Sequence, residues 1–146
     1  MNKTIDLHVH STASDGTFTP MELVAEAKRC GLAAFALTDH DTVDGVSEAL
    51  AAGKASGLEV IPGVELSTEY NGTEIHVVGL FIVPANVKLQ AELAKFRDNR
   101  DNRNLKMVKK LQDEGFRITA EELYRLNPET VVARPHIARY LVNSGQ

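Results

Sequence analysis

Five histidines and several carboxylates are the residues best suited to chemistry, and the first of them gather around a short apolar run. His8 and His10 close the run at 4–9, and both imidazoles reach the same side because side chains two positions apart on a strand share a face. Asp6 lies on that face as well, and Asp15 follows in the next loop. Such a set of imidazoles and carboxylates indicates a metal site.

Two later apolar runs end in the same way. The segment Thr-Asp-His-Asp at 38–41 contributes Asp39, His40 and Asp41, and Glu65 closes the next run. The carboxyl ends of parallel strands are where α/β enzymes build their active sites. Mixed imidazole and carboxylate ligands suit Zn, Mn or Fe better than an all-oxygen magnesium site.

His76 and His136 lie further along the chain. His76 stands among β-branched residues, and His136 follows Arg134 and Pro135 at the start of a helical pattern. A single histidine in such a place is more often a hydrogen-bonded core residue than a ligand. The three strand ends together favour a metal site, because they place ligand types at one edge of a sheet.

The elements that must position these residues alternate between strand and helix. Thr19, Pro20 and Glu22 form a capping box with proline at the first helical position, and Asp41 is a candidate cap for the following helix. The expected order is strand 4–9, helix 20–30, strand 33–38, a helix ending near 57, and strand 58–66. This alternation predicts a parallel sheet with right-handed crossovers.

The pattern changes after the third strand. Asn71-Gly72, between two β-rich segments, is a strong hairpin signal. The remaining chain is helical, with helices expected at 89–114, 119–126 and 135–143. We interpret 1–83 as an α/β portion, 84–131 as a helical insertion, and 132–146 as the start of a return to the α/β portion.

Charge is distributed unevenly along the chain, whose net charge is −4. Residues 1–80 contain 4 Lys/Arg and 12 Asp/Glu, whereas residues 81–146 contain 12 and 8. An acidic half suits a cation site and a basic half suits an anionic substrate, although chance asymmetry of solvated surfaces is the alternative. The net negative charge disfavours a general nucleic-acid binder.

The compartment is indicated by cysteine usage and hydropathy. Cys30 is the single cysteine, which excludes an internal disulfide and suits a reducing cytoplasm. The sequence contains no apolar run that could span a bilayer and no signal-peptide h-region. We therefore expect a cytoplasmic protein without membrane association.

Five segments resemble successive motifs of the PHP (polymerase and histidinol phosphatase) family: 7–16, 37–41, 62–67, 74–79 and 133–138. They are most similar to the stand-alone bacterial branch, which contains nucleoside 3′,5′-bisphosphate phosphatases that also act as 5′→3′ exonucleases on short RNA. The resemblance implies an α/β fold, part of a distorted (β/α)7 TIM-like barrel with a helical insertion. It also implies a cluster of up to three divalent metal ions, with Mn, Zn or Fe as candidates.

The resemblance assigns roles motif by motif. One metal would be held by His8, His10 and Glu65, a second by Glu65, His76 and His136, and a third by Asp15 and His40. Asp6, Asp39 and Asp41 would orient these ligands. The implied reaction is phosphoester hydrolysis by a water that the metals activate, with no separate protein base.

Three arginines are candidates for phosphate binding. Arg100 and Arg103 occupy the apolar seam of the long helical segment, where an arginine needs an anion or a carboxylate partner. The alternative is a helix that breaks near 98–102 and leaves both arginines in solvent. Arg134, beside His136, is the third candidate.

The substrate implied by the resemblance is a small nucleotide or a short RNA, without sequence-specific nucleic-acid binding. A histidinol-phosphate-type phosphatase and a non-catalytic metal-binding module are the alternatives. Members of the branch are longer and end with an Asp-x-His motif, which does not follow His136 here. We therefore expect an N-terminal portion of the barrel with an incomplete metal cluster and little activity of its own.

Overall fold

The computed structural model describes residues 4–146 and contains four strands and five helices in that range. The strands are β1 (Thr4–Val9), β2 (Leu32–Leu37), β3 (Glu59–Tyr70) and β4 (Thr73–Leu80). The helices are α1 (Pro20–Arg29), α2 (Val46–Ser56), α3 (Val87–Asp113), α4 (Ala120–Leu126) and α5 (Arg134–Asn143). Among these residues, none of the helices combines the length and apolarity that crossing a bilayer requires.

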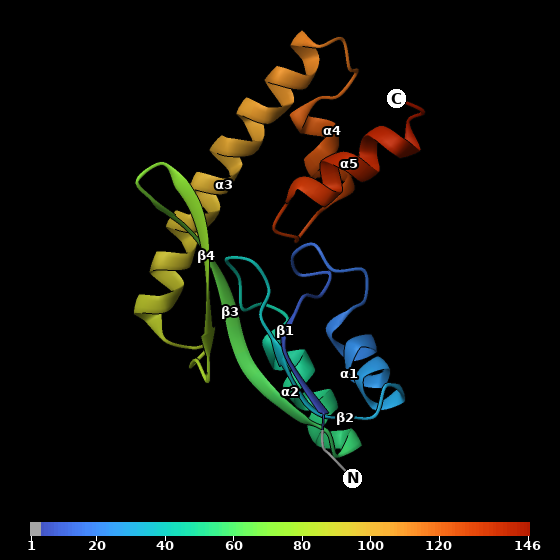
Figure 1. Ribbon diagram of the computed structural model, residues 1–146, viewed down its shortest axis with the longest axis vertical. Helices are drawn as coiled ribbons and strands as arrows, with labels where there is room; N and C mark the ends of the chain where they lie inside the picture. The colour runs from blue at the N-terminus through green and yellow to red at the C-terminus, as the bar shows by residue number, and fades with distance from the viewer. Residues whose placement is uncertain (1–3) are drawn as a thin grey trace.

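The strands form one curled sheet in the order β1-β2-β3-β4 (Figure 1). β1, β2 and β3 are parallel, as the alternation of strands and helices predicts, so their carboxyl ends meet at one edge. β4 pairs antiparallel with β3 through the turn at Asn71 and Gly72, which both adopt positive φ. The predicted hairpin is therefore confirmed.

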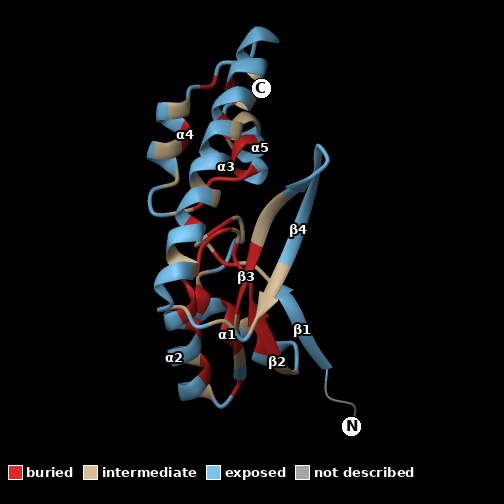
Figure 2. Cartoon of the chain, turned by 90° about the vertical axis from the view of Figure 1, so that its left-hand side faces the viewer, coloured by how far each residue is buried: buried red, intermediate tan, exposed pale blue. Residues whose placement is uncertain are grey.

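Helices cover one face of this sheet, and the main apolar core lies between them (Figure 2). Phe35 and Leu37 of β2 pack there against Val24 of α1 and Val46 of α2. Val9 of β1 joins the edge of this cluster, whereas the rest of β1 is exposed. Because strand side chains alternate, the opposite face carries the even-numbered residues of β1, including His8.

The long helix α3 connects the sheet to a second helical cluster (Figure 1). Leu93, near its start, belongs to the core of the sheet, and Val108 packs with Leu123 of α4 and Ile137 of α5. α5 therefore packs within the helical cluster. The predicted division of the chain at 132 stays a prediction.

Two local expectations from the sequence are wrong, and one alternative is excluded. α2 begins at Val46 rather than after Asp41, because Asp41 adopts φ 54° and its carboxylate is engaged elsewhere. β3 does not stop at Leu66 but continues to Tyr70, because the hairpin extends its ladder. The expected long helix is present as α3, and the alternative of a break near 98–102 is wrong, because Arg100 and Asn104 are buried within one continuous helix.

The mixed α/β class is confirmed, with a curled sheet of four strands in the described part of the chain. Glycines allow the close approach at the ligand-bearing edge. A Cβ added at Gly16 would lie 2.1 Å from the carbonyl oxygen of His10, so the loop after β1 requires glycine at that position.

Candidate metal centre

The segment that follows β2 is joined by backbone hydrogen bonds to the middle of β3. Glu65 N–H donates to the carbonyl of Asp39 at 3.1 Å, and Asp41 N–H donates to the carbonyl of Glu65 at 2.9 Å. His40 lies between them and forms an isolated parallel bridge with Glu65. The segment after β2 and the middle of β3 thus bring an imidazole and a carboxylate to adjacent positions.

Glu65 is the centre of the cluster, and four imidazoles surround its carboxylate. Its Oε2 lies 2.9 Å from His8 Nε2, 3.0 Å from His10 Nε2 and 3.3 Å from His40 Nδ1. Its Oε1 lies 2.8 Å from His76 Nδ1. The Glu65 side chain is only 5% exposed, whereas that of His8 is 51% exposed, so the cluster opens toward solvent on the β1 side.

Asp15 provides a second carboxylate on the other side of the imidazoles. Its oxygens lie 3.4 Å from His10 Nδ1 and 3.7 Å from His40 Nε2. Three groups have ligand atoms within 4.8 Å of one another: His8/His10/Glu65, His10/Asp15/His40 and His40/Glu65/His76. The groups share His10, His40 and Glu65, so ions held by them would be neighbours. Glu65 belongs to two of the groups and could contribute to two ions.

The chemistry of this donor set fits divalent metal ions. A neutral imidazole has a single N–H, yet both ring nitrogens of His10 and of His40 face carboxylate oxygens of Asp15 and Glu65. His40 Nδ1 is buried and lacks a hydrogen-bond partner, although it lies beside that oxygen. A cation between nitrogen and oxygen atoms satisfies all of these lone pairs, and Zn, Mn and Fe accept such mixed ligands.

The ionisation states also suit metal ligation. Burial lowers the pKa of His40 to about 4, and the positive charge of Arg100 acts in the same direction. Burial raises the pKa of Glu65, but the imidazoles of His8, His40 and His76 around its carboxylate outweigh burial, so the pKa falls overall. His40 is therefore a neutral imidazole and Glu65 an ionised carboxylate at neutral pH.

The three aspartates predicted to orient the ligands act through the backbone and through serines. Asp39, 1% exposed, accepts hydrogen bonds from Ser11 Oγ at 2.6 Å and Ser14 Oγ at 2.7 Å. Ser14 Oγ in turn lies 3.4 Å from His10 Nδ1, so Asp39 reaches that ligand indirectly. Asp6 accepts from the backbone N–H of His8 and contacts no ligand imidazole among the described residues.

Asp41 faces away from the metal cluster. It accepts a hydrogen bond from Ser67 N–H at 2.9 Å and pairs with Arg100 Nη2 at 2.9 Å. Asp41 and Arg100 are both buried, at 0% and 3% side-chain exposure. Asp41 therefore links the strand end next to His40 with α3 rather than touching a ligand side chain.

His136 is the one predicted ligand outside the three groups found among residues 4–146. It is buried at the start of α5, and its Nδ1 accepts a hydrogen bond from Ala133 N–H at 3.0 Å. Burial lowers the pKa of His136, and the positive charge of Arg139 acts in the same direction. Among residues 4–146, His136 therefore makes no side-chain hydrogen bond or ion pair with the clustered ligands, and its role as a ligand stays a prediction.

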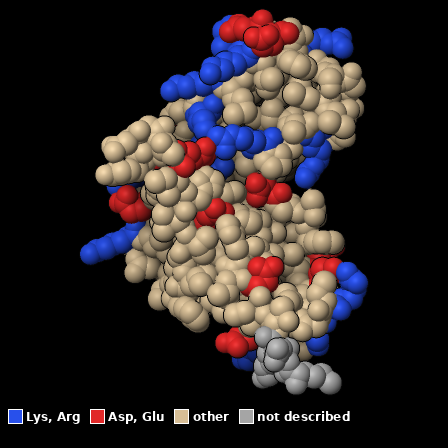
Figure 3. All heavy atoms as spheres, in the orientation of Figure 1, with Lys and Arg blue, Asp and Glu red and all other residues tan. Residues whose placement is uncertain are grey.

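The three candidate arginines have different partners. Arg100 is paired with Asp41, whereas Arg103 Nη1 and Arg134 Nη2 approach the carboxylate of Glu74 at 2.9 and 2.6 Å. A cavity of about 1000 Å³ lies between α3 and the β3–β4 hairpin. Its lining includes Ser67, Glu74, Phe96, Arg100, Arg103 and Lys106. Figure 3 shows a band of basic side chains beside acidic ones at the lower edge of the helical half.

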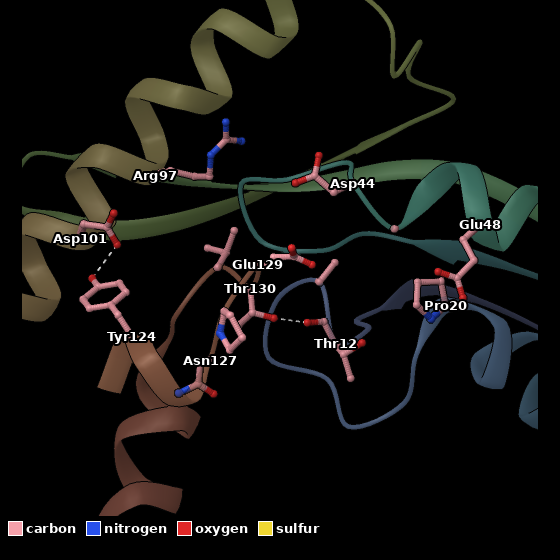
Figure 4. Close-up of a pocket in the computed structure, with 14 residues that line it drawn as sticks. Thr12, Pro20, Asp44, Glu48, Arg97, Asp101, Tyr124, Asn127, Glu129 and Thr130 are labelled. Carbon is pink, nitrogen blue, oxygen red and sulfur yellow. Dashed lines mark hydrogen bonds between the residues drawn. The ribbon is translucent and has the colours of Figure 1, made fainter. Parts of the chain in front are cut away.

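A second cavity, of about 930 Å³, lies between the loop after β1, the start of α2 and the helical cluster (Figure 4). Arg97, Asp101 and Tyr124 line it, and the Tyr124 hydroxyl donates to Asp101 at 2.6 Å. None of the clustered imidazoles lines this cavity. The candidate metal centre is therefore separate from this cavity.

Sequence reasoning missed Glu74 and Ser14. Glu74 lies two residues before His76 on β4, so the two-residue period of a strand places both side chains on one face and could have identified it. Ser14 carries no such local signal, because its partner Asp39 is 25 positions away in the chain.

Comparisons with known proteins agree with this geometry. The family described as "PHP domain" matches residues 6–139. The chain is 42% identical to a "5'-3' exoribonuclease" of Haemophilus influenzae, covering 100% of this chain and 53% of that protein. It is 41% identical to a "3',5'-nucleoside bisphosphate phosphatase" of Chromobacterium violaceum, covering 97% of this chain and 50% of that protein.

Solved structures show the same fold. An amidohydrolase structure from Chromobacterium violaceum superposes with a TM-score of 0.87 at 40% identity, covering 97% of this chain and 50% of that one. A candidate metal-dependent phosphoesterase from Bifidobacterium adolescentis gives a TM-score of 0.88 at 34% identity, covering 98% and 51%. The chain thus spans about half the length of the relatives it matches. The chain belongs to the PHP domain family.

Proposed function

We propose that this chain supplies the N-terminal part of a metal-dependent phosphoesterase site that acts on nucleoside 3′,5′-bisphosphates and on the 5′ end of short RNA. The observation that carries the proposal is the buried carboxylate of Glu65 with four imidazole nitrogens within 3.3 Å. The names of the relatives, an exoribonuclease and a nucleoside bisphosphate phosphatase, support the substrate class.

The residues that would hold the ions are the members of the three groups, with His136 as a further ligand beside Glu65 and His76: His8, His10, Asp15, His40, Glu65, His76 and His136. Mn, Zn and Fe are the candidate ions, up to three in the completed site. When bound, such ions supply positive charge for the phosphate oxygens and make a water acidic near neutral pH.

The residues of this chain would bind and orient the phosphoester. Arg103 and Arg134 stand beside the cluster on Glu74 and carry the forked donors that suit phosphate oxygens. Arg100 was expected to reach phosphate too, but that contact would require breaking its buried pair with Asp41. We therefore assign phosphate binding first to Arg103 and Arg134, with Arg100 holding α3 against the centre.

The remaining architecture is part of the same proposal. The curled sheet would be the start of a distorted (β/α)7 barrel at 1–83, with 84–131 as the insertion and 132–146 leading back to the barrel. The relatives extend beyond the region matched here, so we propose that further ligands come from a segment corresponding to the rest of those proteins. A cytoplasmic location is the accompanying prediction.

The test is phosphate release from adenosine 3′,5′-bisphosphate by the chain alone and by a fusion to the remaining half of the Chromobacterium violaceum relative. With Mn²⁺, the fusion should release phosphate and the chain alone should release far less. Glu65→Gln should abolish release by the fusion. Faster turnover of histidinol phosphate would favour the alternative phosphatase, and a folded, metal-loaded fusion without turnover would support a non-catalytic metal-binding module.

A further inference from the structure

Glu74 joins three elements through one carboxylate beside the metal centre. On β4 it lies 3.1 Å from His76 Nε2. Its oxygens also lie 2.9 Å from Arg103 Nη1 on α3 and 2.6 Å from Arg134 Nη2 on α5. Glu74 thus connects the hairpin, α3 and α5 to the imidazole of His76. It is well placed to control the orientation and the tautomer of that imidazole.

His76 lies between two carboxylates. Its Nδ1 is 2.8 Å from Glu65 Oε1, and its Nε2 is 3.1 Å from Glu74 Oε1. A neutral imidazole has one N–H, so it can donate to only one of the two oxygens. If Nε2–H donates to Glu74, the lone pair of His76 Nδ1 is left facing Glu65 Oε1. These two atoms can then both be ligands of one cation.

Two arginines act on the carboxylate that accepts the hydrogen bond from His76 Nε2. Arg103 and Arg134 satisfy Glu74 with charged hydrogen bonds and so hold it as an oriented anion. Glu65 has no arginine or lysine partner among residues 4–146 and is surrounded by imidazoles instead. The proton of His76 therefore has a fixed acceptor on the Glu74 side, away from the metal cluster.

We propose that Glu74 is a positioning residue that holds His76 as the Nε2–H tautomer and leaves Nδ1 free for a metal ion. The inference rests on the metal centre of the proposed function and deepens it. Carboxylates that orient metal-ligating histidines in this way are general, and their loss commonly lowers metal affinity about 10–100-fold. Here the orienting carboxylate is itself anchored by arginines from two helices.

Histidine-ring NMR of the ¹⁵N-labelled chain tests the proposal, with Zn²⁺ as the probe ion. The ring nitrogen shifts report which nitrogen carries the proton, and a His76→Asn spectrum assigns the signals. In the unaltered chain, zinc should shift Nδ1 of His76 while Nε2 keeps its proton. In Glu74→Ala, the ring should show mixed tautomers, and the zinc affinity read at His76 should fall about 10–100-fold.

Two further variants separate positioning from charge. Glu69 lies directly opposite Glu74 in the hairpin register and makes no side-chain hydrogen bond or ion pair with residues 4–146, so Glu69→Ala is a matched control. It should leave the tautomer and the zinc affinity unchanged. Glu74→Gln keeps an oxygen acceptor and should retain the Nε2–H tautomer with a smaller loss of affinity.

Three results would overturn the proposal. These are an unchanged tautomer and zinc affinity in Glu74→Ala, an equal loss in Glu69→Ala, or a proton moved to Nδ1 in Glu74→Gln. Glu74→Gln keeps the test decisive if the alanine variant disrupts the hairpin. The readout here is zinc binding at His76, whereas the proposed function is tested by phosphate release. A fusion that releases no phosphate would therefore contradict the proposed function without contradicting this inference.

Discussion

Arg100 and Asp41 form a buried ion pair that fastens α3 to the end of β2. Both Nε and Nη2 of Arg100 lie 2.9 Å from Asp41 Oδ2, and Nη2 also donates to the Ser67 hydroxyl. Ser67 N–H closes the ring by donating to Asp41 Oδ1 at 2.9 Å. Because Asp41 directly follows His40, the pair determines where the helical half lies relative to a central ligand.

Arg100→Met should destabilise the chain strongly. Removing the guanidinium leaves the buried carboxylate of Asp41 without a countercharge, which costs about 3–5 kcal/mol in comparable pairs. Lys95→Met is the control on the same helix, because Lys95 is 68% exposed and, among residues 4–146, pairs only with Glu92. Urea denaturation should show a change of about 0.5 kcal/mol or less for the control. Equal losses in both variants would contradict the structural role of Arg100.

Metal ions should stabilise the folded chain. Ions that bind the cluster in the folded state shift the unfolding equilibrium, by about 2.7 kcal/mol when the free ion is at a hundred times its dissociation constant. The thermal midpoint should therefore fall on chelation and recover on addition of Mn²⁺. A midpoint that is insensitive to both treatments would argue against an ordered metal centre.

Two variants should show how much Glu65 and His8 each contribute to metal binding. Glu65 belongs to two ligand groups and is buried, whereas His8 belongs to one and is half exposed. Glu65→Gln should remove most of the Mn²⁺-dependent stabilisation, and His8→Gln should remove only part of it. Equilibrium dialysis with metal analysis measures the number of ions retained. A larger loss in His8→Gln would place the centre of the cluster elsewhere.

Arg103→Ala and Arg134→Ala should each weaken the binding of inorganic phosphate to the Mn²⁺-loaded chain. A hydrogen bond between charged groups contributes about 1.5–3 kcal/mol, so a loss of about tenfold or more in affinity is expected for each. Lys110→Ala, an exposed substitution in the last turn of α3, is the control. Calorimetric titration with phosphate measures the effect, and an unchanged affinity in both arginine variants would refute their assignment.

The ion pairs of Glu74 should make part of the stability depend on pH. The hydrogen bond from Arg134, followed by that from His76, lowers the pKa of Glu74 from 4.5 to about 2. A carboxylate with a depressed pKa stabilises the folded chain above pH 4.5, and this contribution is lost as the pH falls toward about 2. The difference in thermal midpoint between the unaltered chain and Glu74→Gln should therefore be larger at pH 6 than at pH 3. A difference independent of pH would show that the ion pairs contribute little.

The sequence by itself determined where the ligand-bearing strand ends would meet. The spacing of His8 and His10, the run that ends in His40 and the position of Glu65 depend on strand periodicity and on the direction of parallel strands, which are local properties. The Asn-Gly hairpin and the capping box at Thr19 are local as well, and the structure contains both.

The tertiary structure alone decided how the charged residues pair. Arg100 meets Asp41 across 59 positions of the chain, and Arg134 meets Glu74 across 60. An arginine in an apolar seam requires an anionic partner, but its position in the sequence does not say which one. Asp41 is a residue type that often caps helices, but here it is the partner of Arg100. A buried guanidinium without a carboxylate costs more free energy than an uncapped helix end in solvent.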